Sequence, residues 1–445
     1  MKRLLSTLLI VAAVLSPLSS LGAAAPTPVK ELSYAYIDTS APYLTLGEPF
    51  TFQVVLPEDP APYTFEYTFY HNADVTANED FEAVAYEKDL KGQAEFTVTP
   101  KERGKYFLEV RVMDADYRSI KLVSQPLFGY EAAEAGDPST LPGKVAQLTQ
   151  ELAAQNLASD YDKALWLNNW LIYNSDYDES MQEHHPEGVL LKGTGVCESY
   201  ALAYQMLLQQ AGIDSLYVTG YSRGELHAWN LVQLDGEWTY VDTTWNDPKG
   251  GGAESCDYFG LPDELLKRDH DWSYSNFIPP AAIGTESNYN AKNGYVSFDS
   301  AESLAKVLED AAAAREPKVS LTYQGTDKYF NINDELKKWV RDNGYRYFVN
   351  SWSNLGSDFS SRLELTYLDS EGYLAFDSEE AFKALMEEQM KSKPETIKVN
   401  YAGPDPYFMI RSMLDRWLYD NSGAYGVKSY QYNYTDKTAE VTLNY

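Results

Sequence analysis

The sequence predicts a multidomain fold with an N-terminal immunoglobulin-like β-sandwich, a central α+β domain and a C-terminal pair of small α/β repeats. The chain has 445 residues, which is too long for one domain of roughly 100–200 residues. Its hydrophobic pattern changes from alternation to helical spacing near residue 140, and a short motif recurs in its last third. The predicted divisions are a signal peptide over 1–24, the sandwich over 29–131, the α+β domain over 137–282, and repeats over 290–372 and 373–445.

The first residues have the pattern of a secretory signal peptide. Lys2 and Arg3 precede a largely apolar run from Leu4 to Leu18, and small residues follow. We place the cleavage after Ala24, because cleavage one residue later would leave Pro26 beside the scissile bond. No later stretch is long and apolar enough to span a bilayer. We therefore expect a secreted, extracellular protein that is not membrane-spanning, and association with the cell surface is left open.

Short runs of alternating residues predict the N-terminal sandwich. They are separated by turn residues, as in an antiparallel fold of immunoglobulin type. Examples are Phe50–Val55, Tyr63–Tyr70, Ala94–Val98 and Tyr106–Met113. The segment from Glu131 to Pro142 contains Ala, Gly and Pro, and it is interpreted as a linker.

Helical spacing marks the start of the central domain. It runs from Leu141 to Asn156 and again from Tyr161 to Tyr173, where Asp160 is the expected N-cap of the second helix. Strand patterns follow further along the chain. A mixed α+β domain therefore extends to about Pro280.

The last third of the chain is an internal duplication. The run Phe298–Glu302 recurs 78 residues later as Phe376–Glu380. Each copy continues with a helix, a strand, a second helix and two Tyr-rich strands, which predicts two related α/β units. Aromatic residues in strands usually serve packing, and stacking on glycan rings is the alternative.

Charge and cysteine content narrow the function classes. A net charge of −30 argues against a nucleic-acid partner, since phosphate binding needs clustered Lys and Arg. Two cysteines are too few for a disulfide scaffold. Cys197 and Cys256 allow one bridge, but a nucleophilic thiolate cannot remain in a permanent disulfide. We expect both to be reduced thiols.

The first candidate site residue is Cys197, in the first turn of a predicted helix. The apolar positions of this helix follow helical spacing, and Gly212 is its expected C′ residue; they are Val196, Tyr200, Ala203, Leu207 and Ala211. Unpaired backbone N–H groups and the helix dipole stabilise a thiolate at such a position, and they donate to an oxyanion. Taken alone, the pattern fits a small buried residue at a helix start equally well.

A predicted hairpin brings the other two candidates together. Leu226–Leu234 and Glu237–Thr244 are expected strands, joined by the two-residue turn Asp235-Gly236. This turn sets a register in which His227 and Asp242 are diagonal neighbours on one face, within roughly 7–8 Å. Such a carboxylate fixes the imidazole tautomer and leaves the other ring nitrogen for a thiol.

The strings GVCESYA at 195–201 and HAWNLVQLDGEWTYVDTTW at 227–245 resemble the Cys, His and Asp motifs of the transglutaminase-like superfamily. The core of that superfamily is similar in layout to papain-like cysteine proteases. The resemblance covers roughly 141–280 and implies that Cys197, His227 and Asp242 are nucleophile, base and orienting carboxylate. It also implies a side-chain oxyanion donor ahead of the nucleophile, for which Tyr177 is preferred over Trp170 and Asn174.

The function implied is a cysteine-dependent acyl transfer through a thioester on a protein or peptide substrate. Whether that substrate is cell-wall or surface-associated is left open. A peptidase or amidase is favoured, because water is abundant outside the cell. The alternatives are a protein-crosslinking transglutaminase and a non-catalytic cell-surface binding or adhesion module. No cofactor or metal is expected. His184-His185 as a metal pair and an Asp/Glu glycosidase pair lack supporting spacing.

Overall fold

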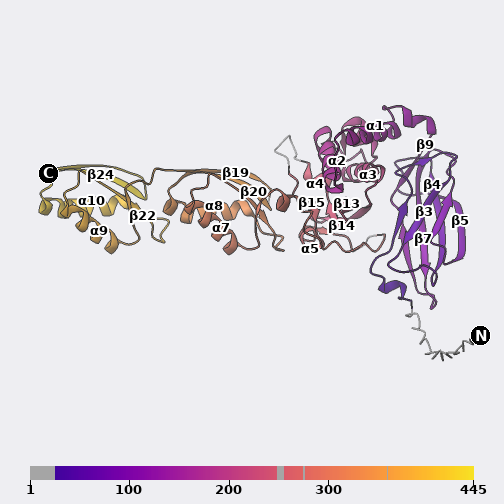
Figure 1. Ribbon diagram of the computed structural model, residues 1–445, viewed down its shortest axis with the longest axis horizontal. Coiled ribbons are helices and arrows are strands. Elements are labelled where there is room, and N and C mark those ends of the chain that lie inside the picture. The colour runs from indigo at the N-terminus through magenta and orange to yellow at the C-terminus, as the bar shows by residue number, and fades with distance from the viewer. Residues whose placement is uncertain (1–25, 248–254, 274–275, 358) are drawn as a thin grey trace, which may run out of the picture.

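The computed structural model describes residues 26–247, 255–273, 276–357 and 359–445. The predicted signal peptide and its cleavage after Ala24 lie outside these ranges. Four packed units follow one another along an elongated molecule, with the N-terminal β unit at one end and two small α/β units at the other (Figure 1). Across the described ranges, no helix combines the length and apolar character needed to cross a bilayer.

The N-terminal unit consists of two sheets. One has the order β1-β3-β6, and the other has the order β2-β9-β7-β4-β5, with β8 paired to β7. The strand bounds are β1 Tyr36–Thr39, β2 Leu44–Thr45, β3 Phe50–Val55, β4 Thr64–Asn72, β5 Glu82–Lys91, β6 Glu95–Val98, β7 Gly104–Met113, β8 Ser119–Val123 and β9 Leu127–Tyr130. Phe52 and Phe96 of the first sheet share a buried core with Phe69 and Leu108 of the second. An immunoglobulin-type strand order for this unit stays a prediction.

The segment expected to be a linker has regular structure. The 3-10 helix η2 (Ala132–Gly136) begins after Glu131 and is closed by reciprocal hydrogen bonds between Glu131 and Glu134. Helix α1 (Leu141–Ala154) follows, with Thr140 as its N-cap. The predicted N-cap of the next helix, α2 (Asp160–Asn174), is wrong by one residue. Ser159 caps it, because its hydroxyl accepts from the Asp162 N–H, and Asp160 is already helical.

The central unit packs helices against a five-stranded sheet of order β15-β14-β13-β12-β16. Its strands are β12 Ser215–Ser222, β13 Glu225–Leu234, β14 Glu237–Val241, β15 Phe259–Leu261 and β16 His270–Asp271. Its other elements are β10 Asp176–Tyr177, η3 Gly188–Lys192, β11 Thr194–Gly195, α3 Cys197–Gln210, α4 Thr243–Asn246 and α5 Asp263–Leu266. A shared core joins α1, α2 and α3 to one face of the sheet, and this packing positions α3 in the domain.

The two C-terminal units have the same element order. The first, which follows the short helix α6 (Tyr289–Lys292), has β17 Val296–Phe298, α7 Ala301–Ala313, β18 Lys318–Tyr323, α8 Ile332–Asn343, β19 Val349–Gly356 and β20 Ser360–Tyr367. The second has β21 Tyr373–Phe376, α9 Glu379–Lys391, β22 Thr396–Tyr401, α10 Ile410–Asn421, β23 Ser429–Tyr434 and β24 Thr438–Asn444. Their sheets have the orders β17-β18-β20-β19 and β21-β22-β24-β23. Ser300 and Ser378 of the recurring motif each cap the helix that follows, so the motif has the same structural role in both units.

Buried polar links attach the first C-terminal unit to the central one. Asp257 accepts hydrogen bonds from Asn290 Nδ2 (2.8 Å) and Ser360 Oγ (2.9 Å). Arg268 donates to the Tyr323 carbonyl (2.9 Å). Because all of these side chains are buried, the junction between the two units is a packed interface rather than a loose tether.

Candidate active site

Cys197 is the first residue of α3, and its thiol is partly buried. The backbone N–H groups of the first helical turn have no acceptor within the helix. Val196, the residue before Cys197, provides no side-chain cap for them. Gly195 leaves no room for a side chain, because a Cβ there would lie 2.5 Å from Ser199 Oγ. The Ser199 hydroxyl in turn donates to the His185 carbonyl (2.7 Å) and fixes the start of the helix. The sulfur therefore lies at the positive end of a rigidly held helix.

His227 and Asp242 come from the hairpin that the sequence predicts. The register runs from Leu234 opposite Glu237 to Asn230 opposite Val241, as the two-residue turn requires. The predicted end of the second strand at Thr244 is wrong. Strand β14 ends at Val241, because the Asp242 side chain accepts from the Trp245 N–H (3.0 Å) and caps the short helix α4.

The imidazole of His227 donates from Nε2 to Asp242 Oδ2 across 2.6 Å. Both side chains are buried: that of His227 is 9% exposed and that of Asp242 is 0% exposed. Burial acts to lower the pKa of His227, but the Asp242 charge and hydrogen bonds to Asp242 and Cys197 raise it to about 10. With Nε2 committed to Asp242, Nδ1 is the ring nitrogen left for the thiol. An imidazolium is thus stabilised between a carboxylate and Cys197.

His270, which the sequence analysis did not single out, completes the buried cluster. Its Nε2 donates to the same Asp242 oxygen (3.0 Å), and its Nδ1 donates to Asp269 Oδ1 (2.7 Å). Burial acts to lower the pKa of His270, whereas these two hydrogen bonds and the carboxylate charges raise it. Burial acts to raise the pKa of Asp242, but the His227 charge and hydrogen bonds from both imidazoles hold it well below its usual range. The only signal in the sequence is a lone His between two Asp residues.

Among the residues that the structure describes, His227, Asp242 and His270 form a group that could hold a metal ion. One ligand atom from each lies within 4.8 Å of the other two. Both imidazoles, however, direct Nε2 at one carboxylate oxygen at hydrogen-bond distance. A cation would have to replace both hydrogen bonds and would meet the two rings as neutral ligands. The observed geometry therefore fits proton-bearing imidazoles rather than a ligand set.

Tyr177 lies beside the nucleophile. It is in β10, which pairs in parallel with β11 so that Tyr177 is opposite Gly195. Burial and the charge of a Cys197 thiolate raise the pKa of Tyr177 to about 12, so its phenol keeps its proton at neutral pH. The Tyr177 hydroxyl donates to Met181 Sδ (3.6 Å). The other two candidates have their own partners near α2. Trp170 packs against the helical core under Lys144, and Asn174 Nδ2 donates to the Trp170 carbonyl (2.7 Å).

The remaining sequence candidates are drawn into separate contacts. His184 Nδ1 lies 3.0 Å from Glu198 Oε2, whereas the His185 ring packs edge-on against Phe128. The adjacent imidazoles therefore have different partners. Cys256 is a buried thiol whose Sγ lies 3.8 Å from Asn169 Oδ1, and neither it nor Cys197 is in a disulfide.

Known proteins resemble parts of this chain. Residues 146–243 match the family model of the transglutaminase-like superfamily. A kyphoscoliosis peptidase of Mus musculus is 28% identical over 179 residues, which cover 36% of this chain and 26% of that protein. The Lim and transglutaminase domain protein ltd-1 of Caenorhabditis elegans is 26% identical over 133 residues, or 26% of this chain and 18% of that protein. The chain thus spans about a quarter or less of these relatives.

Among solved structures, a TGase crystal structure matches with 18% identity and a TM-score of 0.22, covering 26% of this chain and 34% of that one. A putative cysteine protease from Cytophaga hutchinsonii matches with 13% identity and a TM-score of 0.21, covering 41% of this chain and 75% of that one. The family-model match contains all three residues of the Cys197, His227 and Asp242 constellation. Residues 146–243 of this chain therefore form a transglutaminase-like core domain.

Proposed function

We propose that this protein is a secreted, cysteine-dependent acyl-transfer enzyme that hydrolyses peptide or side-chain amides. One observation carries the proposal. The His227 imidazole is hydrogen-bonded to the buried Asp242 carboxylate (2.6 Å), and its interaction with Cys197 at the start of α3 helps to raise its pKa. A positioned thiol, a base and an orienting carboxylate are the groups that nucleophilic acyl transfer needs.

The reaction begins with attack of the Cys197 thiolate on the carbonyl carbon of the substrate amide. A C–S bond forms, and the C–N bond breaks as His227 gives its proton to the departing amine. Water then attacks the thioester while His227 accepts its proton, and the acid leaves with the thiol restored. The negative oxygen of each tetrahedral intermediate accepts from backbone N–H groups at the start of α3 and from the Tyr177 hydroxyl.

Hydrolysis is favoured over transamidation for two reasons. The N-terminal segment has the pattern of a secretory signal, and outside the cell water is in large excess over free amines. One of the curated relatives that the chain resembles has the name of a peptidase. The proposed substrates are therefore proteins or peptides outside the cell, including those attached to a cell wall or surface.

The test combines two readouts in one incubation. The chain lacking residues 1–24 is mixed with casein and a fluorescent primary amine, and Cys197→Ala is the matched control. The expected result is new peptide amino termini or ammonia, little amine incorporation, and no turnover by the control. Efficient amine incorporation would instead identify a cross-linking transglutaminase. Absence of both products across a broad peptide library, with Cys197 still rapidly alkylated, would favour a binding module.

A further inference from the structure

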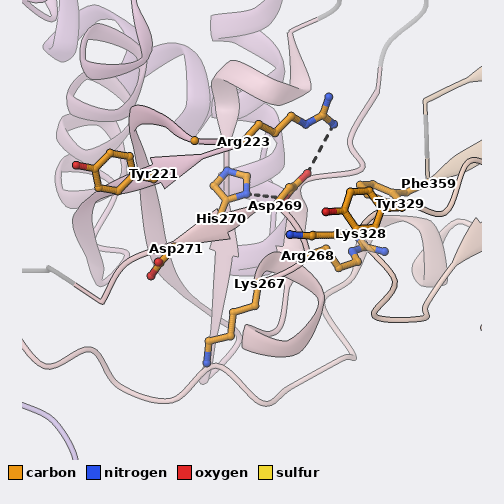
Figure 2. Close-up of a pocket in the computed structure, with 11 residues that line it drawn as sticks. Tyr221, Arg223, Lys267, Arg268, Asp269, His270, Asp271, Lys328, Tyr329 and Phe359 are labelled. Atoms are coloured by element: carbon orange, nitrogen blue, oxygen red, sulfur yellow. Dashed lines mark hydrogen bonds and ion pairs between the residues drawn. The ribbon is translucent and has the colours of Figure 1, made fainter.

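A cavity of about 860 Å³ opens where the central domain meets the first C-terminal unit. On the central side it is lined by the β12–β13 turn and by the segment that forms edge strand β16; on the other side it is lined by the residues after β18 (Figure 2). Cationic side chains come from both sides, and they are Arg223, Lys267, Arg268 and Lys328. The central domain and the first C-terminal unit therefore both contribute to one concave surface.

The cavity has an excess of positive charge within a chain of net charge −30. Its two carboxylates already have partners. Asp269 accepts from His270 Nδ1 (2.7 Å) and from the Tyr258 hydroxyl (2.6 Å). Asp271 accepts from the backbone N–H and the hydroxyl of Ser273 (2.9 and 2.8 Å). Arg223 Nη2 also lies 3.7 Å from Asp269 Oδ2 (Figure 2). An anionic ligand would thus meet four cationic side chains, of which Arg223 is already paired with Asp269.

The cationic wall is held in place by Arg268. This residue is only 6% exposed, donates from Nε to the Leu265 carbonyl (2.8 Å) and from Nη1 to the Tyr323 carbonyl (2.9 Å). Its guanidinium also lies 4.0 Å from the ring centroid of Phe359. Because Leu265 belongs to the central domain and Tyr323 to the first C-terminal unit, Arg268 fixes the two walls relative to each other. The cavity is consequently a preformed feature of the junction.

The cavity lies next to the catalytic cluster. The Arg223 guanidinium is 4.3 Å from the ring centroid of Trp245, whose ring is 6.1 Å from that of His227. The segment that carries His270 lines the cavity, and the buried His270 ring donates to Asp242. The Trp245 ring thus lies near both the cavity residue Arg223 and the catalytic His227, so a peptide bound in the cavity would be close to the catalytic cluster.

We propose that this cavity is a binding subsite for an acidic peptide segment, whose Asp or Glu side chains pair with Arg223, Lys267 and Lys328. Guanidinium and ammonium groups are the usual partners of carboxylates, and Arg adds a bidentate geometry. Tyr221 and Tyr329 provide aromatic surface at the rim for the peptide backbone and side chains. This role in substrate selection rests on the proposed function, whereas the binding itself does not.

The experiment measures binding without catalysis. A fluorescent hexaglutamate peptide and its hexaglutamine counterpart are titrated by anisotropy against the mature chain carrying Cys197→Ala. We expect the glutamate peptide to bind and the glutamine peptide not to bind, with affinity that falls as salt is added. In the same background, Arg223→Gln, Lys267→Gln and Lys328→Gln should each weaken binding roughly two- to threefold, and the triple variant on the order of tenfold.

The matched control is Lys306→Gln, which makes the same charge change on α7, where Lys306 is exposed and 3.7 Å from Asp310. It should bind as the parent does. Equal binding of the two peptides, absence of binding, or equal affinity of the triple and control variants would overturn the subsite. Binding of an anionic polysaccharide in preference to the glutamate peptide would overturn it too. Since the Cys197→Ala chain cannot form a thioester, none of these outcomes depends on the proposed reaction. Should the triple variant unfold, the exposed single variants Lys267→Gln and Lys328→Gln decide the matter.

Discussion

The Nε2 atom of His270 lies 3.0 Å from the same Asp242 oxygen that accepts the His227 proton. The opposite nitrogen of His270 is 2.7 Å from Asp269. A ring that donates from both nitrogens is an imidazolium, and the side chain of His270 is completely buried. Asp242 is thereby fixed by two imidazoles and the Trp245 N–H, so its orientation does not depend on His227 alone.

His270→Gln tests whether His270 positions Asp242. We expect kcat to fall about tenfold with little change in KM, because a misplaced carboxylate holds His227 less well. The His227 pKa should rise above about 10, since a like charge 5.5 Å from its ring has been removed. The rate of Cys197 alkylation is measured against pH, and the pH at which it changes on the alkaline side reports the His227 pKa. His71→Gln in the N-terminal unit is the control. If the alkaline transition of the His270→Gln variant moved to lower pH, the result would show general loss of the site instead.

Asp242→Asn should move the alkaline transition of Cys197 alkylation to lower pH, opposite to the shift expected for His270→Gln. Without the carboxylate charge, burial of His227 dominates, and its pKa falls from about 10 to below its ordinary value of 6.5. At neutral pH the imidazole becomes neutral, and the rate of acyl transfer drops by about 10⁴-fold.

Because the native pKa is raised, the stability that His227 contributes is fully present below pH 6.5 and is lost towards pH 10. Asp242→Asn should remove that pH dependence from urea unfolding, and an unchanged slope would contradict the assignment.

The two cysteines should differ sharply in reactivity. Cys197 is partly exposed at a helix start, whereas Cys256 is 4% exposed. Iodoacetamide should therefore alkylate Cys197 rapidly at a pH where ordinary thiols react slowly, and Cys256 only after unfolding. Peptide mapping by mass spectrometry measures both sites at once. Cys197→Ala should abolish turnover and keep the fold, and Cys256→Ala should remain active. Equal, slow labelling of both sites would exclude an activated nucleophile.

Tyr177→Phe separates oxyanion stabilisation from thiol activation. Loss of the hydroxyl should lower kcat by about 10²-fold, as for removal of one oxyanion donor. The alkylation rate of Cys197 should change little, because that reaction forms no oxyanion. Asn174→Ala is the matched control, since Asn174 donates to the Trp170 carbonyl within α2. An equal loss in both variants would assign Tyr177 a packing role.

The sequence by itself determined the local features of the site. The Asp235-Gly236 turn and the alternation of the flanking strands set the register that brings His227 to Asp242, since a one-residue slip would turn the apolar face to water. Helical spacing likewise placed Cys197 in the first turn of α3. Such signals are readable because turns, caps and periodicity depend on residues that are close in the chain. Asp242 could continue the strand or cap a helix, and it caps α4. The predicted end of the second strand was therefore wrong by a few residues.

The tertiary structure alone decided which distant segments complete the site. His270 reaches Asp242 only because Tyr221 and Asp271 pair at the edge of the sheet, where β16 lies beside β12. The cationic cavity needs the first C-terminal unit to dock through Arg268 and Asp257. No local pattern encodes these contacts, because they depend on burial and hydrogen bonding between segments far apart in the sequence. The physical reason is that a buried charge is stable only beside its partners, and only the packed fold brings those partners together.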